Sequence, residues 1–288
     1  MKFFPAATLL LCLIASCSKY DDTYINGNVP PPDRTIDSAT INLYITKAYI
    51  NLIGREPIQN ETQQAKSILI QNNFSLDNRK QFVDAILAKQ EYIRNQYNVC
   101  RIEYLQNYDS ADIEQQLFVF DNLLTQPQYA PFYDLINYEK NRLVLLKNSA
   151  NELYAGTLNQ KGMLKRMADN YFYDQINMGT ENFVVSTFQN FLFRYPSDAE
   201  LANGKTMVDG NTATIFLQLG KSKTDYLNIF FDTPDYYEGQ VRFIFKKYLF
   251  RDASPAEIAY YGNVYKSSGN YKNLQREIFS LPEYAGLK

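Results

Sequence analysis

The sequence predicts an all-α protein, a multi-helix bundle or repeat of two-helix units. Apolar residues recur three and four positions apart in several segments, which is the period of one face of an α-helix. No segment shows sustained alternation of apolar and polar residues with hairpin turns, the pattern typical of strands. An internal repeat also has the length of two helices and a loop. These three observations favour helices throughout.

The first predicted helix follows Asp37-Ser38, a good N-cap pair, and ends at Gly54. Its apolar stripe runs through residues 41–53. The same period recurs in five further segments that we expect to be helical: 92–105, 113–124, 133–146, 163–176 and 183–193.

The beginning of the chain matches a bacterial lipoprotein signal. A charge at Lys2 and an apolar run over residues 6–14 precede Ala15, Ser16 and Cys17. A run this short cannot span a bilayer permanently, so it fits a cleaved export signal over residues 1–16. We therefore expect Cys17 to be the first mature residue, with acyl chains such as palmitate on its sulfur and amine. The membrane is then a partner through Cys17.

Residues 17–37 are predicted to be a flexible tether, because they are polar and contain Gly27 and the stiff run Pro30-Pro31-Pro32. We divide the remainder into an N-terminal helical region, 38–180, and a C-terminal helical region, 181–288. The second region contains two of the repeat units.

Missing residue types exclude several kinds of site. The chain has no histidine, which excludes Ser-His-Asp and Cys-His catalysis, H-E-x-x-H zinc sites and C-x-x-C-H haem attachment. We predict no catalytic residue, no metal site and no cofactor. The 29 basic and 31 acidic residues nearly balance, so nucleic acid is not an expected partner. Once Cys12 leaves with the signal and Cys17 carries lipid, Cys100 has no partner for an intramolecular disulfide.

The aromatic residues have two interpretations. The 24 Tyr and 19 Phe could fill a core or line a sugar-binding surface, and their helical spacing favours the core. Cys100 lies on a stripe with Tyr97 and Tyr104, which predicts a buried, inert thiol. The ring-dense stretch 170–174 fits either a buried helix or an exposed interaction patch.

Three segments form the internal repeat. Each has an arginine followed six residues later by a glutamate, and each closes with an acidic residue and a tyrosine. The anchors are Arg55, Glu61 and Tyr92 in the first copy, Arg194, Glu200 and Tyr236 in the second, and Arg251, Glu257 and Tyr284 in the third. The arginine-to-tyrosine spacing is 37, 42 and 33 residues, the length of a two-helix unit with a variable loop.

These anchors are predicted to be structural. Ser197 to Glu200 and Ser254 to Glu257 are capping boxes, so the shared glutamate caps a helix. The arginine can pair with that glutamate or cap the preceding helix, which would lock the corner. A catalytic Arg-Glu pair is the less favoured alternative, because capping already explains the spacing. The closing tyrosine is predicted to be a core anchor with a hydrogen-bonded hydroxyl, rather than a ligand contact.

The Gly-Arg-Glu-Pro turn at 54–57 and the Pro-Glu-Tyr closure at 282–284 resemble two families. One comprises small helical repeats of secreted bacterial proteins without an assigned function. The other is the helical domain of unknown function in planctomycete surface proteins that accompany cytochrome-c-like modules. The resemblance covers the first copy and most of 180–288, and it implies a helical fold but no catalytic residue. The absence of C-x-x-C-H here departs from the cytochrome-linked architecture and leaves any redox role to a different chain.

Together these features predict a membrane-anchored, non-enzymatic interaction or scaffold lipoprotein of the bacterial cell envelope. We expect it at the outer membrane, on the periplasmic face or the cell surface, with a protein partner. The alternative is a glycan- or peptide-binding surface lipoprotein that uses exposed tyrosines. An enzyme is a third alternative, which a carboxylate pair facing a deep cleft would favour.

Overall fold

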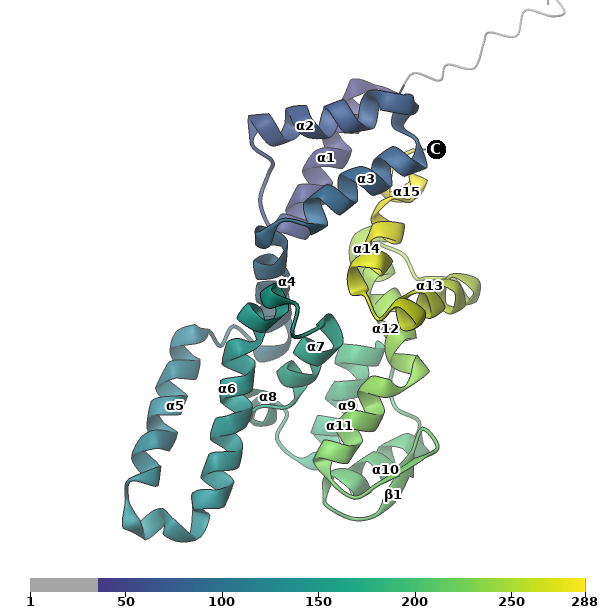
Figure 1. Ribbon diagram of the computed structural model, residues 1–288. Helices are drawn as coiled ribbons and strands as arrows, with labels where there is room; N and C mark the ends of the chain where they lie inside the picture. The colour runs from purple at the N-terminus through teal and green to yellow at the C-terminus, as the bar shows by residue number, and fades with distance from the viewer. Residues whose placement is uncertain (1–35, 288) are drawn as a thin grey trace, which may run out of the picture. The chain divides into compact units, whose positions relative to one another are not determined.

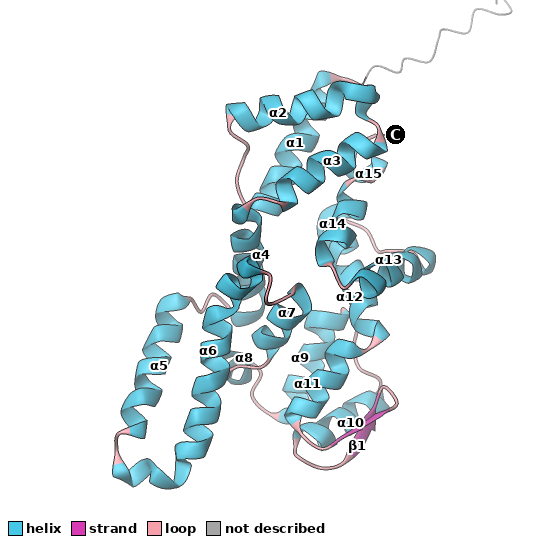
Figure 2. Ribbon diagram, in the orientation of Figure 1, coloured by secondary structure: helices cyan, strands magenta, loops and turns pink. Residues whose placement is uncertain are grey.

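The structure is a computed structural model that describes residues 36–287. These residues belong to one compact unit and are almost entirely helical, which confirms the predicted all-α fold (Figure 2). The predicted signal, Cys17 and all but the last two residues of the tether lie outside the described residues.

The helices and strands follow one another along the chain in Figure 1. The first group is α1 (Ser38–Ile53), α2 (Gln59–Ile70), η1 (Gln71–Phe74), α3 (Leu76–Leu87) and α4 (Gln90–Leu105). The second group is α5 (Ser110–Leu124), η2 (Pro127–Phe132), α6 (Tyr133–Ala155), α7 (Gln160–Ala168) and α8 (Tyr171–Ile176). The third group is α9 (Thr180–Thr187), η3 (Phe188–Leu192), α10 (Asp198–Val208), β1 (Ala213–Ile215), β2 (Gln218–Gly220) and α11 (Lys223–Asp232). The last group is α12 (Pro234–Ile244), η4 (Phe245–Leu249), α13 (Pro255–Ser268), α14 (Tyr271–Phe279) and α15 (Pro282–Ala285).

Each copy of the repeat has the same four-helix order. A first helix ends two residues before the repeat arginine, and two helices follow. A fourth helix has the acidic residue and the tyrosine in its first turn. The first copy is α1 to α4, the second is α9 with η3 to α12, and the third is α12 with η4 to α15. The second and third copies therefore share α12, which closes one and opens the other.

The three copies differ most in the loop between their second and third helices. The first copy has the short helix η1 there, the second has the β1–β2 hairpin, and the third has only Gly269 and Asn270. The different arginine-to-tyrosine spacings thus arise mainly at one place in the unit, which is the variable loop expected from the sequence.

The β1–β2 hairpin is an addition to the predicted all-helical chain. The strands are antiparallel, with Ala213 opposite Gly220 and Ile215 opposite Gln218. The two turn residues, Phe216 and Leu217, have φ of 50° and 62°. Such left-handed turns usually carry Gly or Asn, so the sequence lacks the usual hairpin signal.

The single helix expected over residues 163–176 is wrong, because the structure has two helices there. Asn170 interrupts the run: its Oδ1 accepts from the backbone N–H groups of Phe172 and Tyr173 and so caps α8. Its Nδ2 donates to the carbonyls of Arg166 and Met167 at the end of α7. One side chain therefore satisfies both helix ends. Phe172 and Tyr173 are buried, so residues 170–174 belong to a buried helix and not to an exposed interaction patch.

The first and third copies pack directly on one another. The Tyr44 hydroxyl of α1 donates to the Phe279 carbonyl at 3.1 Å. Arg79 Nε of α3 donates to the Ser280 carbonyl at 2.8 Å. The Tyr44 ring also lies 6.0 Å from the ring of Tyr284 in α15. Segments more than 200 residues apart thus share one core.

The first helix of each copy ends in a left-handed residue just before the arginine. This residue is Gly54 in the first copy, with φ 82°, but Phe193 and Phe250 in the others, with φ 54° and 57°. A side chain at Gly54 would also collide, since an added Cβ would lie 2.5 Å from Asn95 Oδ1. In the later copies a π-helical turn precedes the phenylalanine. A phenylalanine in this conformation carries backbone strain.

We predict that Phe250→Gly stabilises the protein. The Phe250 side chain is 81% exposed, so its removal sacrifices little packing, and glycine relieves the left-handed strain. The free energy of unfolding should rise by about 0.5–1 kcal/mol, measured by urea denaturation followed by circular dichroism.

Phe193→Gly is the matched control, since it changes the equivalent backbone position of the second copy. The Phe193 ring stacks on Phe243 at 4.9 Å, so its loss should offset the relieved strain and lower the stability. Equal losses of stability in the two variants would contradict the assignment of strain at Phe250.

Candidate functional site

The repeat anchors meet in three corners, each centred on one arginine. In the first corner, Arg55 Nη1 and Nη2 donate to the two carboxylate oxygens of Glu61 at 2.8 and 3.0 Å. Its Nε and Nη2 donate to Oε1 of Glu91, the acidic residue at the start of α4. Nη1 also donates to the Glu56 carbonyl at 2.9 Å. All five N–H groups of the guanidinium are thereby used.

The same contacts recur in the other two corners. Arg194 donates to both oxygens of Glu200, to Asp235 and to the Tyr195 carbonyl. Arg251 donates to both oxygens of Glu257, to Glu283 and to the Asp252 carbonyl. Because no N–H group is left over, the corners bind helices to one another and offer no donor to a ligand.

Each glutamate also begins a helix. Glu200 and Glu257 form the expected capping boxes with Ser197 and Ser254. Glu61 accepts from the backbone N–H of Ile58 at 2.9 Å, and it also pairs with Lys89.

An aromatic ring lies beneath each arginine, always six residues before it. The guanidinium carbon is 6.0 Å from the ring centre of Tyr49 in the first corner. The corresponding distances are 4.9 Å for Arg194 over Phe188 and 4.8 Å for Arg251 over Phe245. These contacts place the cation against the π face of the ring.

The closing tyrosines are buried core residues, and each hydroxyl has a hydrogen-bond partner. Tyr92 donates to Gln275, Tyr236 bonds the hydroxyl of Tyr265, and Tyr284 accepts from Asn51 at 2.9 Å. Burial raises the pKa of all three hydroxyls, so they remain neutral donors and acceptors.

Sequence reasoning missed the second carboxylate of each corner. The sequence shows an acidic residue before each closing tyrosine, and in the structure these residues, Glu91, Asp235 and Glu283, bind the arginine. The signal was present, because every copy has an acid at this position. The sequence does not show that the start of the fourth helix of each copy lies against the arginine that follows its first helix.

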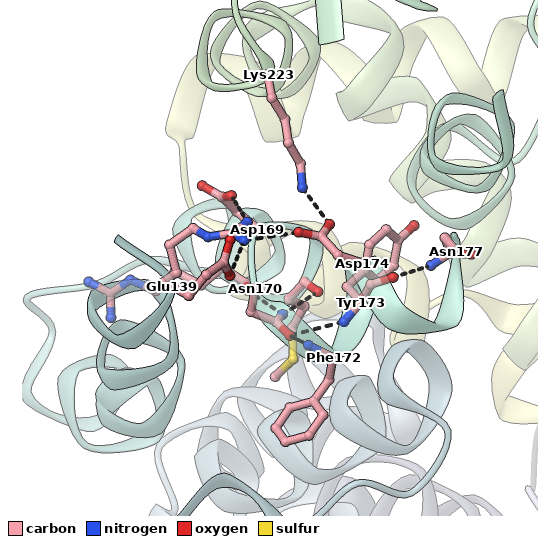
Figure 3. A network of polar contacts seen from close by, with 11 residues as sticks. Glu139, Asp169, Asn170, Phe172, Tyr173, Asp174, Asn177 and Lys223 are labelled. Atoms are coloured by element: carbon pink, nitrogen blue, oxygen red, sulfur yellow. Dashed lines mark hydrogen bonds and ion pairs between the residues drawn. The ribbon is translucent and has the colours of Figure 1, made fainter. Parts of the chain in front are cut away.

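A further polar network joins the middle of the chain to α11. Arg142 of α6 is 7% exposed at its side chain and pairs with Glu139, Asp169 and Asp174. Lys223 of α11 pairs with the other carboxylate oxygen of Asp174, and Figure 3 shows it extending from its helix towards that residue. Two cations thus hold three carboxylates at the meeting point of α6, α7, α8 and α11. Removal of Arg142 alone would leave partly buried carboxylates without their main partner, so the network ties these helices together.

Cys100 is buried, as its helical stripe predicted. Burial raises the pKa of its thiol to about 12. A thiol with this pKa remains protonated near neutral pH and is a poor nucleophile.

The hairpin formed by α5, η2 and α6 carries several exposed apolar side chains. Along it α5 packs against α6, with ion pairs Lys140–Asp121 and Lys147–Glu114 (Figure 1). These exposed side chains, here called the hairpin surface, are Phe118, Val119, Tyr129, Phe132, Leu135, Tyr138, Leu145 and Tyr154. Every lysine and arginine of the hairpin already has a carboxylate partner. Residues 110–155 contain six acidic and three basic side chains, so the hairpin combines exposed apolar side chains with an excess of acids.

None of the helices between residues 36 and 287 has the length and hydropathy needed to cross a bilayer. The same residues contain no cluster of three acidic or cysteine side chains arranged to hold a metal ion.

No family model matches the chain, and no curated protein or solved structure is significantly similar to it.

The corner glutamates predict a loss of stability in acid. Hydrogen bonds from the arginines lower the pKa of Glu61 and of Glu257 to about 2. Since these folded-state values lie below the ordinary value near 4.5, the stabilisation is complete above pH 4.5 and is lost as the pH falls towards 2. The free energy of unfolding, measured by urea denaturation between pH 7 and 2.5, should fall over this window.

The variant Glu61→Gln with Glu257→Gln separates charge from capping, because glutamine still fits a capping box. It should be less stable than the wild type at pH 7 and show a shallower decline in acid. Glu56→Gln, at an exposed glutamate outside the ion pairs, should leave the profile unchanged. A double variant with the slope of the wild type would exclude the corners as the source.

Proposed function

We propose that this chain is a membrane-anchored, non-enzymatic interaction or scaffold lipoprotein of the bacterial cell envelope. The lipoprotein signal ending at Cys17 supports the anchor and an outer-membrane location, on the periplasmic face or the cell surface. The main polar clusters support a structural role for the folded part of the chain. The charged side chains of the three corners and of the Arg142 network form ion pairs that join helices to one another.

The observation that carries the proposal is the hairpin surface. A side chain such as Phe118, 67% exposed, or Leu135, 59% exposed, costs free energy in water unless a partner covers it. The excess of acids on this hairpin favours a partner protein that presents basic residues around an apolar centre. We therefore propose an envelope protein of that chemistry as the partner.

The aromatic residues favour this proposal over a glycan- or peptide-binding lipoprotein that uses tyrosines. Most rings fill the core, and the tyrosines with the greatest exposure are scattered. Tyr195, Tyr260 and Tyr154 lie after η3, on α13 and on α6 respectively. An extended glycan or peptide would contact several exposed rings together, and the most exposed tyrosines are not gathered on one element.

The anchor can be tested by metabolic labelling with an alkyne-bearing palmitate. The wild type should take up the label and sediment with membranes, and Cys17→Ser should lose both properties. Cys100→Ala is the matched control and should keep the label, because the Cys100 thiol is buried. An unlabelled wild type, or a labelled Cys17→Ser variant, would contradict the proposed anchor.

The hairpin surface can be tested by photocrosslinking in intact cells. A benzoylphenylalanine residue at Phe118 or Leu135 should give a discrete adduct with one basic envelope protein. The same residue at Tyr260, which is 60% exposed on α13, should not give that adduct. The proposal fails if neither hairpin position yields an adduct, or if all three positions yield the same one.

A further inference from the structure

A cavity of about 450 Å³ lies beside the first corner, at the C-terminal end of α6. Three separate parts of the chain line it: the α3–α4 junction, the α6–α7 turn and the loop before α14. The first and third copies of the repeat thus meet the middle of the chain here. Its volume is in the range of pockets that hold small molecules.

The cavity has a positive character. No aspartate or glutamate within residues 36–287 lines it. The helices α4, α7 and α14 all begin at its wall, since Gln90, Gln160 and Tyr271 are their first residues and are among the lining. Each helix start contributes a partial positive charge. The side-chain oxygens of Asn159 and Asn270 cap α7 and α14, whereas the N-cap of α4, Lys89, has no acceptor in its side chain and leaves the start of α4 uncapped.

Lys272 adds a whole charge to this wall. Its ammonium donates to the Leu87 carbonyl at 2.8 Å and lies 5.2 Å from the ring centre of Tyr92. An ammonium has three N–H donors, so two remain after this bond. Burial alone lowers the pKa of Lys272, because no described carboxylate offsets it. The other lining lysine, Lys89, is already paired with Glu61.

Neutral polar groups complete the lining. The amides of Gln90, Asn159 and Asn270 are among them, together with the ring of Tyr154, which is 60% exposed. The Oδ1 atoms of Asn159 and Asn270 already accept from the backbone N–H groups of Gly162 and Lys272, but their amide N–H groups can still donate to hydroxyl groups. A tyrosine ring suits the C–H face of a sugar.

We propose that this cavity binds a small hydroxylated anion, a sugar acid or a sugar phosphate, with its anionic group on Lys272. The amides hold the hydroxyl groups, and Tyr154 covers one face of the ligand. The two sources of the negative charge, carboxylate and phosphate, share this chemistry. The cavity shares only the C-terminal end of α6 with the hairpin, and Phe118 and Leu135 do not line it, so either proposal can fail without the other.

Isothermal titration calorimetry on the mature chain with Cys17 replaced by serine tests the site. The probes are D-glucuronate, D-glucose 6-phosphate, D-glucose and inorganic phosphate. At least one of the two charged sugars should bind at least ten-fold more tightly than glucose, and its binding should weaken as salt is added. The charged sugar that binds more tightly identifies the source of the anion. If neither charged sugar exceeds glucose, the proposal is overturned.

Two variants identify the residues. Lys272→Gln should weaken the charged sugar at least ten-fold, whereas Lys266→Gln, at an exposed lysine of α13, should leave it unchanged. Tyr154→Ala alters an exposed side chain, so it tests the cavity even where Lys272→Gln fails to fold. It should weaken the charged sugar several-fold. Unchanged affinity in a folded Lys272→Gln variant, or in Tyr154→Ala, would overturn the assignment.

Discussion

One guanidinium fixes three helix ends at every corner of the repeat. Arg194, for example, follows the first helix of its copy. It donates to Glu200 at the start of the second helix and to Asp235 at the start of the fourth. Bidentate geometry sets direction as well as distance, because both oxygens of Glu200 must lie in the plane of the arginine. The third helix and the loop before it are outside this constraint. The unit can therefore change in length there, by a hairpin or by two residues, while its corner remains the same.

The shared helix α12 extends this constraint from one copy to the next. It begins with Asp235 in the second corner, and the η4 turn that follows it leads to Arg251 in the third. It also lies very close to η3: an added Cβ at Gly239 would be 2.6 Å from the Phe191 carbonyl. Gln240 and Arg242 donate to the carbonyls of Phe191 and Leu192, which the π-helical turn exposes. The π-helical turn η3 and the helix α12 therefore cross at close range, with Gly239 at the contact and hydrogen bonds from Gln240 and Arg242 across it.

The sequence was sufficient for the parts of the fold that local chemistry controls. The apolar period, the capping boxes at Ser197 and Ser254 and the burial of Cys100 depend on neighbours within one or two turns, so they could be predicted. The second carboxylate of each corner depends on a contact across more than 30 residues, which spacing alone does not reveal. The Asn170 break and the Phe216-Leu217 turn use residues that also occur inside helices. The cavity around Lys272 could not be predicted, since it joins three distant segments.

The packing of the first copy on the third has a topological consequence. Tyr44 and Tyr284 share a core, and an added Cβ at Gly286 would lie 4.0 Å from Thr40, so the two ends of the described body are neighbours. The first and last helices of the described residues are therefore in contact. Where two ends meet in this way, the native contacts do not depend on which loop is left open. A circular permutant, joined across these ends and opened in the α5–α6 connection, could draw on the same corners, the same shared helix and the same core.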